Sequence, residues 1–223
     1  MKYKSHRPFY LLKTCLACIT LTLYYTGNPT QAQKITSYSS PALLKESVHT
    51  FAGPQDLIIT PDGGYLLVAD TGNDEIKILQ PGTLNILGQF GTGYLKSPRS
   101  IKIDESGKIL VMDDENKRVT SFSFKGVFKN GTVNVKMIEQ RNNVKTMQTS
   151  TKPAADASGQ SYVVNSPKNQ IEIFNKSGAQ IGIYRAEGIK NPMAVETVGR
   201  YFWIADTGNN RILLLKAPRQ LEP

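Results

Sequence analysis

The sequence predicts an all-β protein built from four repeats. Two segments, 66–78 and 202–214, nearly copy each other, and both contain the run Ala-Asp-Thr-Gly-Asn. Degenerate copies at 111–119 and 163–171 lie between them. A period of about 40 residues with several short strands per unit is typical of a β-propeller. The equivalent points are 43, 52 and 41 residues apart, at Asp70, Asp113, Asn165 and Asp206.

Each unit is predicted to contain short strands separated by turns. In the first unit the continuous apolar run 65–69 predicts a buried strand. Turns are indicated by segments rich in Pro, Asp, Gly and Asn, such as 61–64. No segment after residue 32 shows the apolar period of a helix over a dozen residues, so the class is all-β. The expected strands are 56–59, 65–69, 75–79 and 84–90; 101–103, 109–112 and 118–124; 162–164, 171–173 and 181–183; and 193–196, 201–205 and 211–215.

The fourth unit lacks a last strand, because only a short segment with two prolines follows Leu215. A strand candidate without a unit of its own, 47–51, precedes the first repeat. We predict that this N-terminal strand is the outer strand of the last blade and closes the ring. Such closure leaves no bare sheet edge between the two ends of the chain. The prediction is therefore a β-propeller of about four four-stranded blades.

The first 32 residues are typical of a secretory signal peptide. Four basic residues precede and flank an apolar run at 14–25, and small residues at 30–32 suit cleavage after Ala32. Both cysteines lie in this leader, so a mature chain would have no thiol for a disulfide or a metal. We expect a secreted or periplasmic protein, held at a membrane only if the leader stays uncleaved. The expected divisions are signal peptide 1–32, N-terminal linker 33–45, propeller 46–217 and C-terminal tail 218–223.

The repeats resemble a known family. An apolar run, Ala-Asp-Thr-Gly-Asn and then Arg-Ile, with a preceding Gly-containing turn and an upstream Pro, is similar to the NHL repeat, and the segment 202–212 shows most of this pattern. Two of the four copies match closely, and together the copies span most of residues 46–217. The resemblance implies a propeller with a surface that binds other molecules. The chain departs from the family in blade number, because NHL propellers usually carry six.

The repeated turns are expected to be structural. A carboxylate beside Asn also suits a calcium site. However, Asp accepts hydrogen bonds from turn amides, and Gly and Asn tolerate a positive φ. Because the motif recurs once per blade, we interpret it as part of each blade rather than as one site. The residues assigned to these structural turns are Asp70, Gly72, Asn73, Asp113, Asp206, Gly208 and Asn209.

A basic segment, 125–152, is the candidate binding site. The chain has a formal net charge of +9; removing the four basic residues of the leader leaves +5. The segment holds six basic residues and one acid, so it accounts for that whole surplus. It also contains the longest spacing between repeats, which indicates a long loop or an extended outer hairpin. A solvated loop without a ligand is the alternative. The candidate residues are Lys125, Lys129, Lys136, Arg141, Lys145 and Lys152.

Enzymatic chemistry has less support in the sequence. Only one histidine lies beyond the leader, and no Gly-x-Ser-x-Gly segment is present. We assign no catalytic residue and expect neither a cofactor nor a metal. A lactonase-like site would instead need carboxylates that face a central channel, and fold alone does not establish activity. The weak alternative metal ligands, expected at similar places on the four inner strands, are Asp56, Asp104, Asp156 and Glu196.

The sequence thus predicts an exported propeller that acts as a binding scaffold. Its expected partner is a protein or an anionic polysaccharide or surface, because Lys and Arg attract anions. Export and the scarcity of interleaved aromatic residues argue against nucleic acid. The alternative is a propeller hydrolase or lyase with a carboxylate-lined channel. Completion of a larger ring by a second copy is a further possibility.

Overall fold

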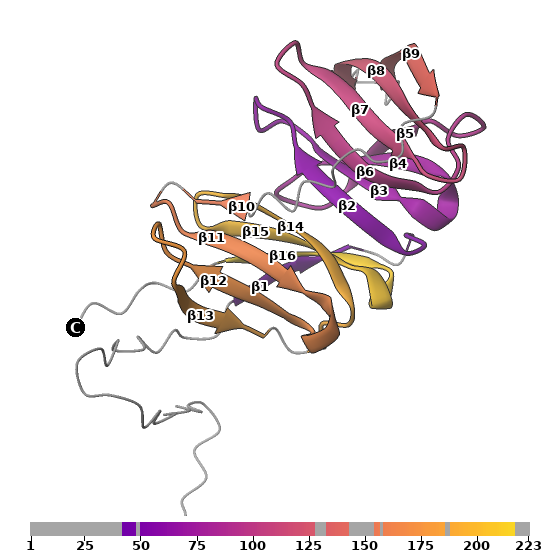
Figure 1. Cartoon of the computed structure of the whole chain (residues 1–223). Coiled ribbons are helices and arrows are strands. Elements are labelled where there is room, and N and C mark those ends of the chain that lie inside the picture. Colours follow the sequence, from indigo (N-terminus) through magenta and orange to yellow (C-terminus); the bar gives the residue numbers. More distant parts are fainter. Residues whose placement is uncertain are drawn as a thin grey trace, which may run out of the picture.

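The computed structural model describes residues 42–47, 50–127, 133–142, 154–156, 158–185 and 188–216. They form four antiparallel sheets of four strands each (Figure 1). No helix in these ranges is long and apolar enough to cross a membrane. The all-β class and the four four-stranded blades are confirmed.

We name the sheets by their order along the chain. The first blade contains β2 (Pro54–Ile59), β3 (Leu66–Asp70), β4 (Glu75–Leu79) and β5 (Ile86–Phe90). The second contains β6 (Pro98–Ile103), β7 (Lys108–Asp113), β8 (Arg118–Val127) and β9 (Val133–Asn142). The third contains β10 (Ala154–Ala155), β11 (Ser161–Asn165), β12 (Gln170–Phe174) and β13 (Gln180–Tyr184). The fourth contains β14 (Pro192–Val198), β15 (Tyr201–Asp206), β16 (Arg211–Lys216) and β1 (Ala42–Glu46).

The N-terminal strand completes the fourth blade, as predicted, but it lies earlier than expected. β1 pairs with β16 from Ala42 opposite Lys216 to Glu46 opposite Leu213. Ser47 continues the pairing, because its amide donates to the Ile212 carbonyl at 2.9 Å. The expected strand 47–51 is therefore wrong by about five residues, and all of β1 except Glu46 falls inside the expected linker 33–45. The reason is that Phe51 is a buried core residue of the connection to β2.

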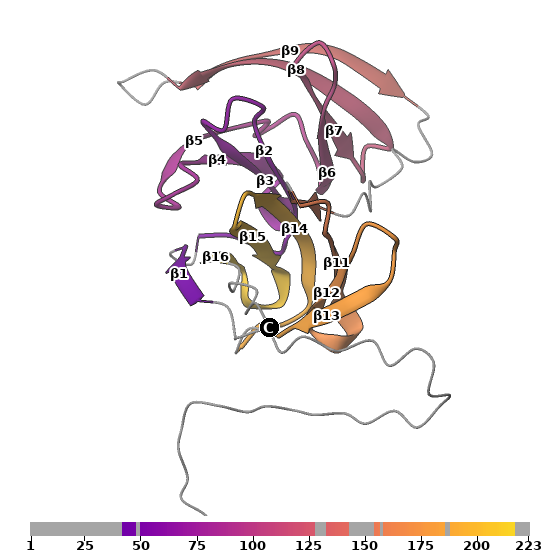
Figure 2. The same ribbon diagram turned by 90° about the vertical axis from the view of Figure 1, so that its left-hand side faces the viewer.

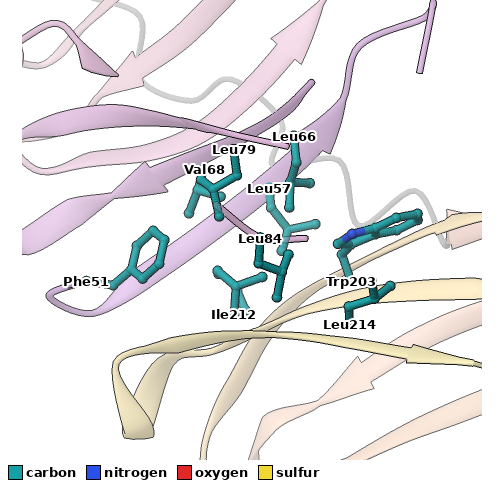
Figure 3. Packing of buried hydrophobic residues seen from close by; sticks show 10 residues of the cluster. Phe51, Leu57, Leu66, Val68, Leu79, Leu84, Trp203, Ile212 and Leu214 are labelled. Atoms are coloured by element: carbon teal, nitrogen blue, oxygen red, sulfur yellow. The ribbon is translucent and has the colours of Figure 1, made fainter. Parts of the chain in front are cut away.

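Three apolar cores join neighbouring blades. One lies between the fourth and first blades, where Trp203 packs near Leu57 and Leu84 (Figure 3). The Trp203 indole also donates to the Pro81 carbonyl at 2.9 Å across this junction. A second core joins the first and second blades, and a third joins the third and fourth blades. Central strands such as β3 and β4 are buried along their whole length because they pack on both faces.

A pair of polar contacts, which we call the clasp, accompanies each of these cores. Thr71 in the first blade donates its hydroxyl to the Pro98 carbonyl of the second at 2.8 Å. Asp74, three residues later, accepts the amide of Ser97 at 2.7 Å. The clasp from the fourth blade to the first uses Thr207 with Pro54 and Asn210 with Gly53, and the clasp from the third to the fourth uses Ser166 with Pro192 and Asn169 with Asn191.

The fourth junction differs from the other three. No hydrophobic cluster of the described residues joins the second blade to the third. In Figure 1 these two blades lie at opposite ends of the arrangement, with the fourth and first blades between them. Among the described residues, apolar cores therefore join three of the four pairs of neighbouring blades in the ring that we predicted.

The second blade carries an extended outer hairpin. β8 and β9 have ten residues each, whereas the first blade's strands have five or six. Figure 2 shows this hairpin reaching beyond the other strands. The extra residues of the longest repeat spacing therefore lengthen β8 and β9. Of the two expectations, a long loop or an extended outer hairpin, the structure shows the hairpin.

Candidate functional site

The repeated turns hold the blades together through a buried aspartate. Asp206 is fully buried, and one of its oxygens accepts the Lys190 amide at 2.7 Å. Its other oxygen accepts from Asn209 Nδ2 at 2.8 Å and Arg211 Nε at 2.6 Å. The contacts satisfy the buried carboxylate and fix the segment that leads into β14. Asp113 makes the same set with Lys96, Asn116 and Arg118, and Asp70 binds the Ala52 amide, Asn73 and Lys77.

The glycine of this turn is required for space rather than for its φ angle. A Cβ atom on Gly72 would lie 2.8 Å from the Ala52 carbonyl oxygen, and one on Gly208 would lie 2.8 Å from the Lys190 carbonyl oxygen. The left-handed position falls two residues after the glycine, at Asp74 with φ 57°. The expected positive φ at Gly72, Asn73, Gly208 and Asn209 is therefore wrong. Glycine is needed at 72 and 208 because the backbone of another segment lies too close for a Cβ atom.

The first blade uses a different cation. Glu75 stands where the second and fourth blades have Arg118 and Arg211. Lys77, whose side chain is buried, donates to both Asp70 and Glu75 and supplies the missing positive charge. The two carboxylates raise the pKa of Lys77 despite its burial. Lys77 is thus the cation that both buried carboxylates share, and without it neither would have this positive partner.

Asp56 is the carboxyl group with the most unusual environment in the described residues. It lies on β2, which packs between β14 and β6, and it is half-buried. Its Oδ2 accepts from the Ile101 amide at 2.8 Å and the Ser100 hydroxyl at 3.0 Å, both on β6. Burial raises the pKa of Asp56 to about 6, although these hydrogen bonds and the charge of Lys102 oppose the rise.

The other three carboxyl candidates do not join Asp56. Asp56 lies two residues after the first proline of its blade, Asp104 lies six after Pro98, and Glu196 lies four after Pro192. These residues are therefore at different levels of their strands. No three or more His, Cys, Asp or Glu side chains among the described residues are placed to hold a metal ion. The expected equivalence of the four carboxyl groups is wrong, because the proline sets the register.

Two of these carboxylates instead fix turns. Asp104 accepts from the Ser106 amide and hydroxyl and from the Lys108 amide, at 2.7 to 3.0 Å. The Ser106 hydroxyl holds the pKa of Asp104 below its usual value. Asp156 makes the same contacts with Ser158 and Gln160, at 2.6 to 3.0 Å. Both groups thus cap a turn, which is the alternative that we gave for them from the sequence.

The basic candidates are only partly within the described residues. Lys125 lies on β8 and Lys136 lies on β9, and both are exposed. Arg141 belongs to β9, but its side chain is outside the described part. Lys136 and Lys108 lie on one face of the second blade, because both belong to the cross-strand row through Ser123. Lys129, Lys145 and Lys152 lie outside the described residues.

Sequence reasoning missed Ser100 and Lys102 as neighbours of Asp56. Their signal was available in the register, since Pro54 and Pro98 are equivalent and Ser100 therefore stands opposite Asp56 on the next blade. Lys102 is half-buried, and its positive charge makes the smallest of the contributions that lower the pKa of Asp56. The site defined by the described residues is thus Asp56, Ser100 and Lys102 on adjacent first strands.

The fold and these repeats define a β-propeller. A model of the lactonase family, described as a seven-bladed β-propeller, matches residues 4–144, more than half of the chain. The chain therefore belongs to this lactonase family. The family description names seven blades, whereas the described residues form four.

Several solved propellers are similar in fold. The periplasmic gluconolactonase of Pseudomonas aeruginosa is 16% identical with a TM-score of 0.34, covering 76% of this chain and 53% of that one. A putative 6-phosphogluconolactonase of Bacteroides uniformis is 19% identical with a TM-score of 0.33, covering 75% and 54%. The Swd1 propeller domain of Myceliophteria thermophila is 15% identical with a TM-score of 0.36, covering 73% and 50%.

The chain spans about half the length of the solved structures that it matches. These likenesses concern the fold and assign no activity to this chain. No curated protein matches it.

Proposed function

We propose that this chain is a hydrolase of the lactonase type that opens a cyclic ester with Asp56 as the base. Family membership supports the reaction class. The observation that carries the proposal is the pKa of Asp56, raised to about 6. A general base works best when its pKa is near the working pH, and carboxyl groups with perturbed pKa values concentrate at functional sites.

The geometry around Asp56 leaves room for this role. A carboxylate offers about four acceptor positions. Three are used, because Oδ2 accepts two hydrogen bonds and Oδ1 accepts the Leu57 amide at 2.9 Å. In the proposed reaction the remaining position on Oδ1 would accept the hydrogen bond of the attacking water molecule. Ser100 is 3% exposed, so it positions Asp56 rather than reaching a substrate.

The proposed reaction needs only water and these side chains. Asp56 takes a proton from water while the water oxygen forms a bond to the ester carbonyl carbon. The Lys102 ammonium stabilises the negative charge that develops on the carbonyl oxygen. The ring C–O bond then breaks, the leaving alkoxide takes the proton from Asp56, and the product is a hydroxy acid.

The experiment is hydrolysis of glucono-δ-lactone, measured as acid release above the spontaneous rate. Loss of a general base typically lowers turnover by about 10²- to 10⁴-fold, and we expect Asp56→Asn to fall in this range. Asp104→Asn is the matched control, because Asp104 caps an exposed turn. No turnover above the spontaneous rate in the unmodified protein, or equal turnover in Asp56→Asn, would overturn the proposal.

A second candidate function is binding of an acidic polysaccharide. The specific observation is that exposed Lys108 and Lys136 share one face of the second blade, and that Lys125, also exposed, lies on the same hairpin. Such an array attracts polyanions in a salt-dependent way. The test is retention on immobilised polygalacturonate, with Lys125→Glu and Lys136→Glu together expected to abolish it. Equal retention by this variant, or by the unmodified protein on an uncharged glucan, would contradict specific binding.

We also propose that the protein is exported and that its repeats are of the NHL type. The basic and apolar leader at 1–32 supports export. The buried Asp, the Asn three residues later and the following Arg, which contact one another in the second and fourth blades, support NHL-type repeats. Sequencing the N-terminus of the extracytoplasmic protein tests export, since cleavage after Ala32 would leave Gln33 first.

A further inference from the structure

The turn of the second blade lacks the residues of the clasp. The other three blades have Thr or Ser as the hydroxyl donor and Asp or Asn as the side-chain acceptor. In the second blade these positions hold Asp114 and Lys117. Asp114 instead lies 3.8 Å from Arg99 within its own blade. A junction from this blade to a following one would therefore depend on contacts between sheet faces.

The open face of the third blade resembles a blade–blade contact without a partner. Val163, Glu172 and Ile183 form one cross-strand row on the face opposite the core that joins the third and fourth blades. Val68, Val111 and Ile204 occupy the position of Val163 in the other blades, and all three are 0% exposed. Val163 is only half-buried, and Ile183 is 49% exposed.

Glu172 supplies a negative charge on this open face. Its carboxylate accepts from Asn165 Nδ2 at 2.8 Å and Gln170 Nε2 at 3.0 Å. No described cation forms an ion pair with it. Glu172 lies between Val163 and Ile183 in this row and has no described ion-pair partner. A complementary partner surface would therefore be partly apolar and carry basic side chains.

The open face of the second blade has that character. Lys102 and Leu110 are paired across β6 and β7, on the face opposite the core with the first blade. Both are half-buried, whereas Lys108 and Lys136 on the same face are exposed. None of the three lysines forms an ion pair with a described residue. Met112 and Val119, nearer the turn, are already buried, so the lysine end of this face is the part open to contact.

We propose that two copies of the chain join into one ring of eight blades. The open face of the second blade in each copy packs against the open face of the third blade in the other. This arrangement is a closed twofold assembly, and eight blades are within the usual range of propellers. Lys108 and Lys136 of one copy face Glu172 of the other, while Leu110 faces Val163 and Ile183. Because the clasp is missing there, these two junctions are weaker than the other six and sensitive to salt.

The first experiment measures the mass of the purified full-length chain by size exclusion with light scattering. At tens of micromolar we expect twice the mass of one chain at low salt and a shift toward one chain at high salt. A single-chain mass at low salt would overturn the proposal. A single-chain mass together with retention on polygalacturonate that depends on Lys136 would assign the lysine face to a polyanion and favour the second candidate function instead.

Charge reversal makes the test specific. One variant carries Lys108→Glu and Lys136→Glu, and the other carries Glu172→Lys; each is expected to have the mass of one chain. In an equimolar mixture every junction regains opposite charges, so a heterodimer with two-chain mass should form. Lys45→Glu is the control, because Lys45 is exposed on β1, away from both faces. Dimers that persist in either single variant, or a mixture that stays monomeric, would contradict the ring.

Discussion

The backbone amide of Gly53 donates a 2.7 Å hydrogen bond to the side-chain oxygen of Asn210, which lies 157 residues later in the chain. The same kind of bond links Ser97 to Asp74 between blades that are consecutive in sequence. The first and last repeats are thus held by the contacts that hold sequence neighbours. The junction between the fourth and first blades thus has the same clasp as its neighbours. The junction that lacks a core among the described residues lies between the second and third blades, in the middle of the sequence.

The clasp predicts a stability loss at Asn210. Asn210→Gly keeps the left-handed backbone, with φ 53°, and removes the hydrogen bond. A net loss of about 1 kcal/mol in the free energy of unfolding is expected, measured by urea denaturation. Lys117→Gly is the control, because Lys117 has φ 52° and stands at the same turn position without a clasp. Equal losses in both variants would show that backbone entropy, and not the clasp, sets the effect.

The close approach at the turns predicts that a single methyl group is costly there. Gly72→Ala and Gly208→Ala each place a Cβ atom 2.8 Å from a carbonyl oxygen. We expect each to lower the free energy of unfolding by about 1 to 3 kcal/mol, as overpacking does. Gly82→Ala, where a Cβ atom meets nothing within 4 Å, should change it little. Thermal unfolding of the three variants decides the matter, and three similar midpoints would refute the packing argument.

The buried ion group around Lys77 predicts a larger loss in the free energy of unfolding, and a second substitution that should restore it. Lys77→Met leaves Asp70 and Glu75 buried without their cation. Removing one partner from a buried ion group costs about 3 to 5 kcal/mol, measurable by urea denaturation. Adding Glu75→Arg restores the pattern of the fourth blade, where Arg211 binds Asp206, and should recover most of the loss. A double variant no more stable than Lys77→Met would mean that the two blades are not interchangeable at this position.

Asp56 predicts a specific pH dependence of stability. Burial raises the pKa of Asp56 from its ordinary value of 3.8 to about 6, so the native state binds a proton more readily than the unfolded state. Between about pH 4 and 6 this group therefore makes stability fall as pH rises, and its cost is complete above pH 6. Asp56→Asn should remove that slope. Urea denaturation from pH 4 to 8 gives the difference, and parallel curves for the two proteins would exclude the raised pKa.

Much of the fold follows from the repeat. Runs such as 65–69 and 201–205 are apolar throughout because their strands pack between two neighbouring sheets, and this signal predicts β3 and β15 closely. The missing strand of the last unit likewise predicts its completion by the N-terminus. Its exact position was not predictable, because Phe51 resembles a strand residue although it fills the core beside β2.

The candidate site was less predictable because it depends on register across blades. Asp56 is one acid among several in the sequence, and its raised pKa arises from burial against Ser100 and Ile101 of another repeat. The sequence alone suggested that Asp104 and Asp156 are equivalent to Asp56. Alignment of the first strands on their prolines shows that Asp104 stands at a different level from Asp56. The open junction had a sequence signal, since Lys117 stands where Asp74, Asn169 and Asn210 stand, but its meaning needs the contacts of those three residues.

The most direct test of the proposed function is the pH dependence of glucono-δ-lactone hydrolysis, corrected for the spontaneous rate, in the unmodified protein, Asp56→Asn and Asp104→Asn. Because a base must be ionised, kcat/KM should rise with pH to a plateau with a midpoint near 6 in the unmodified protein and in Asp104→Asn. This limb should be absent from the residual activity of Asp56→Asn. A limb near pH 6 that persists in Asp56→Asn would contradict the assignment of Asp56 as the base.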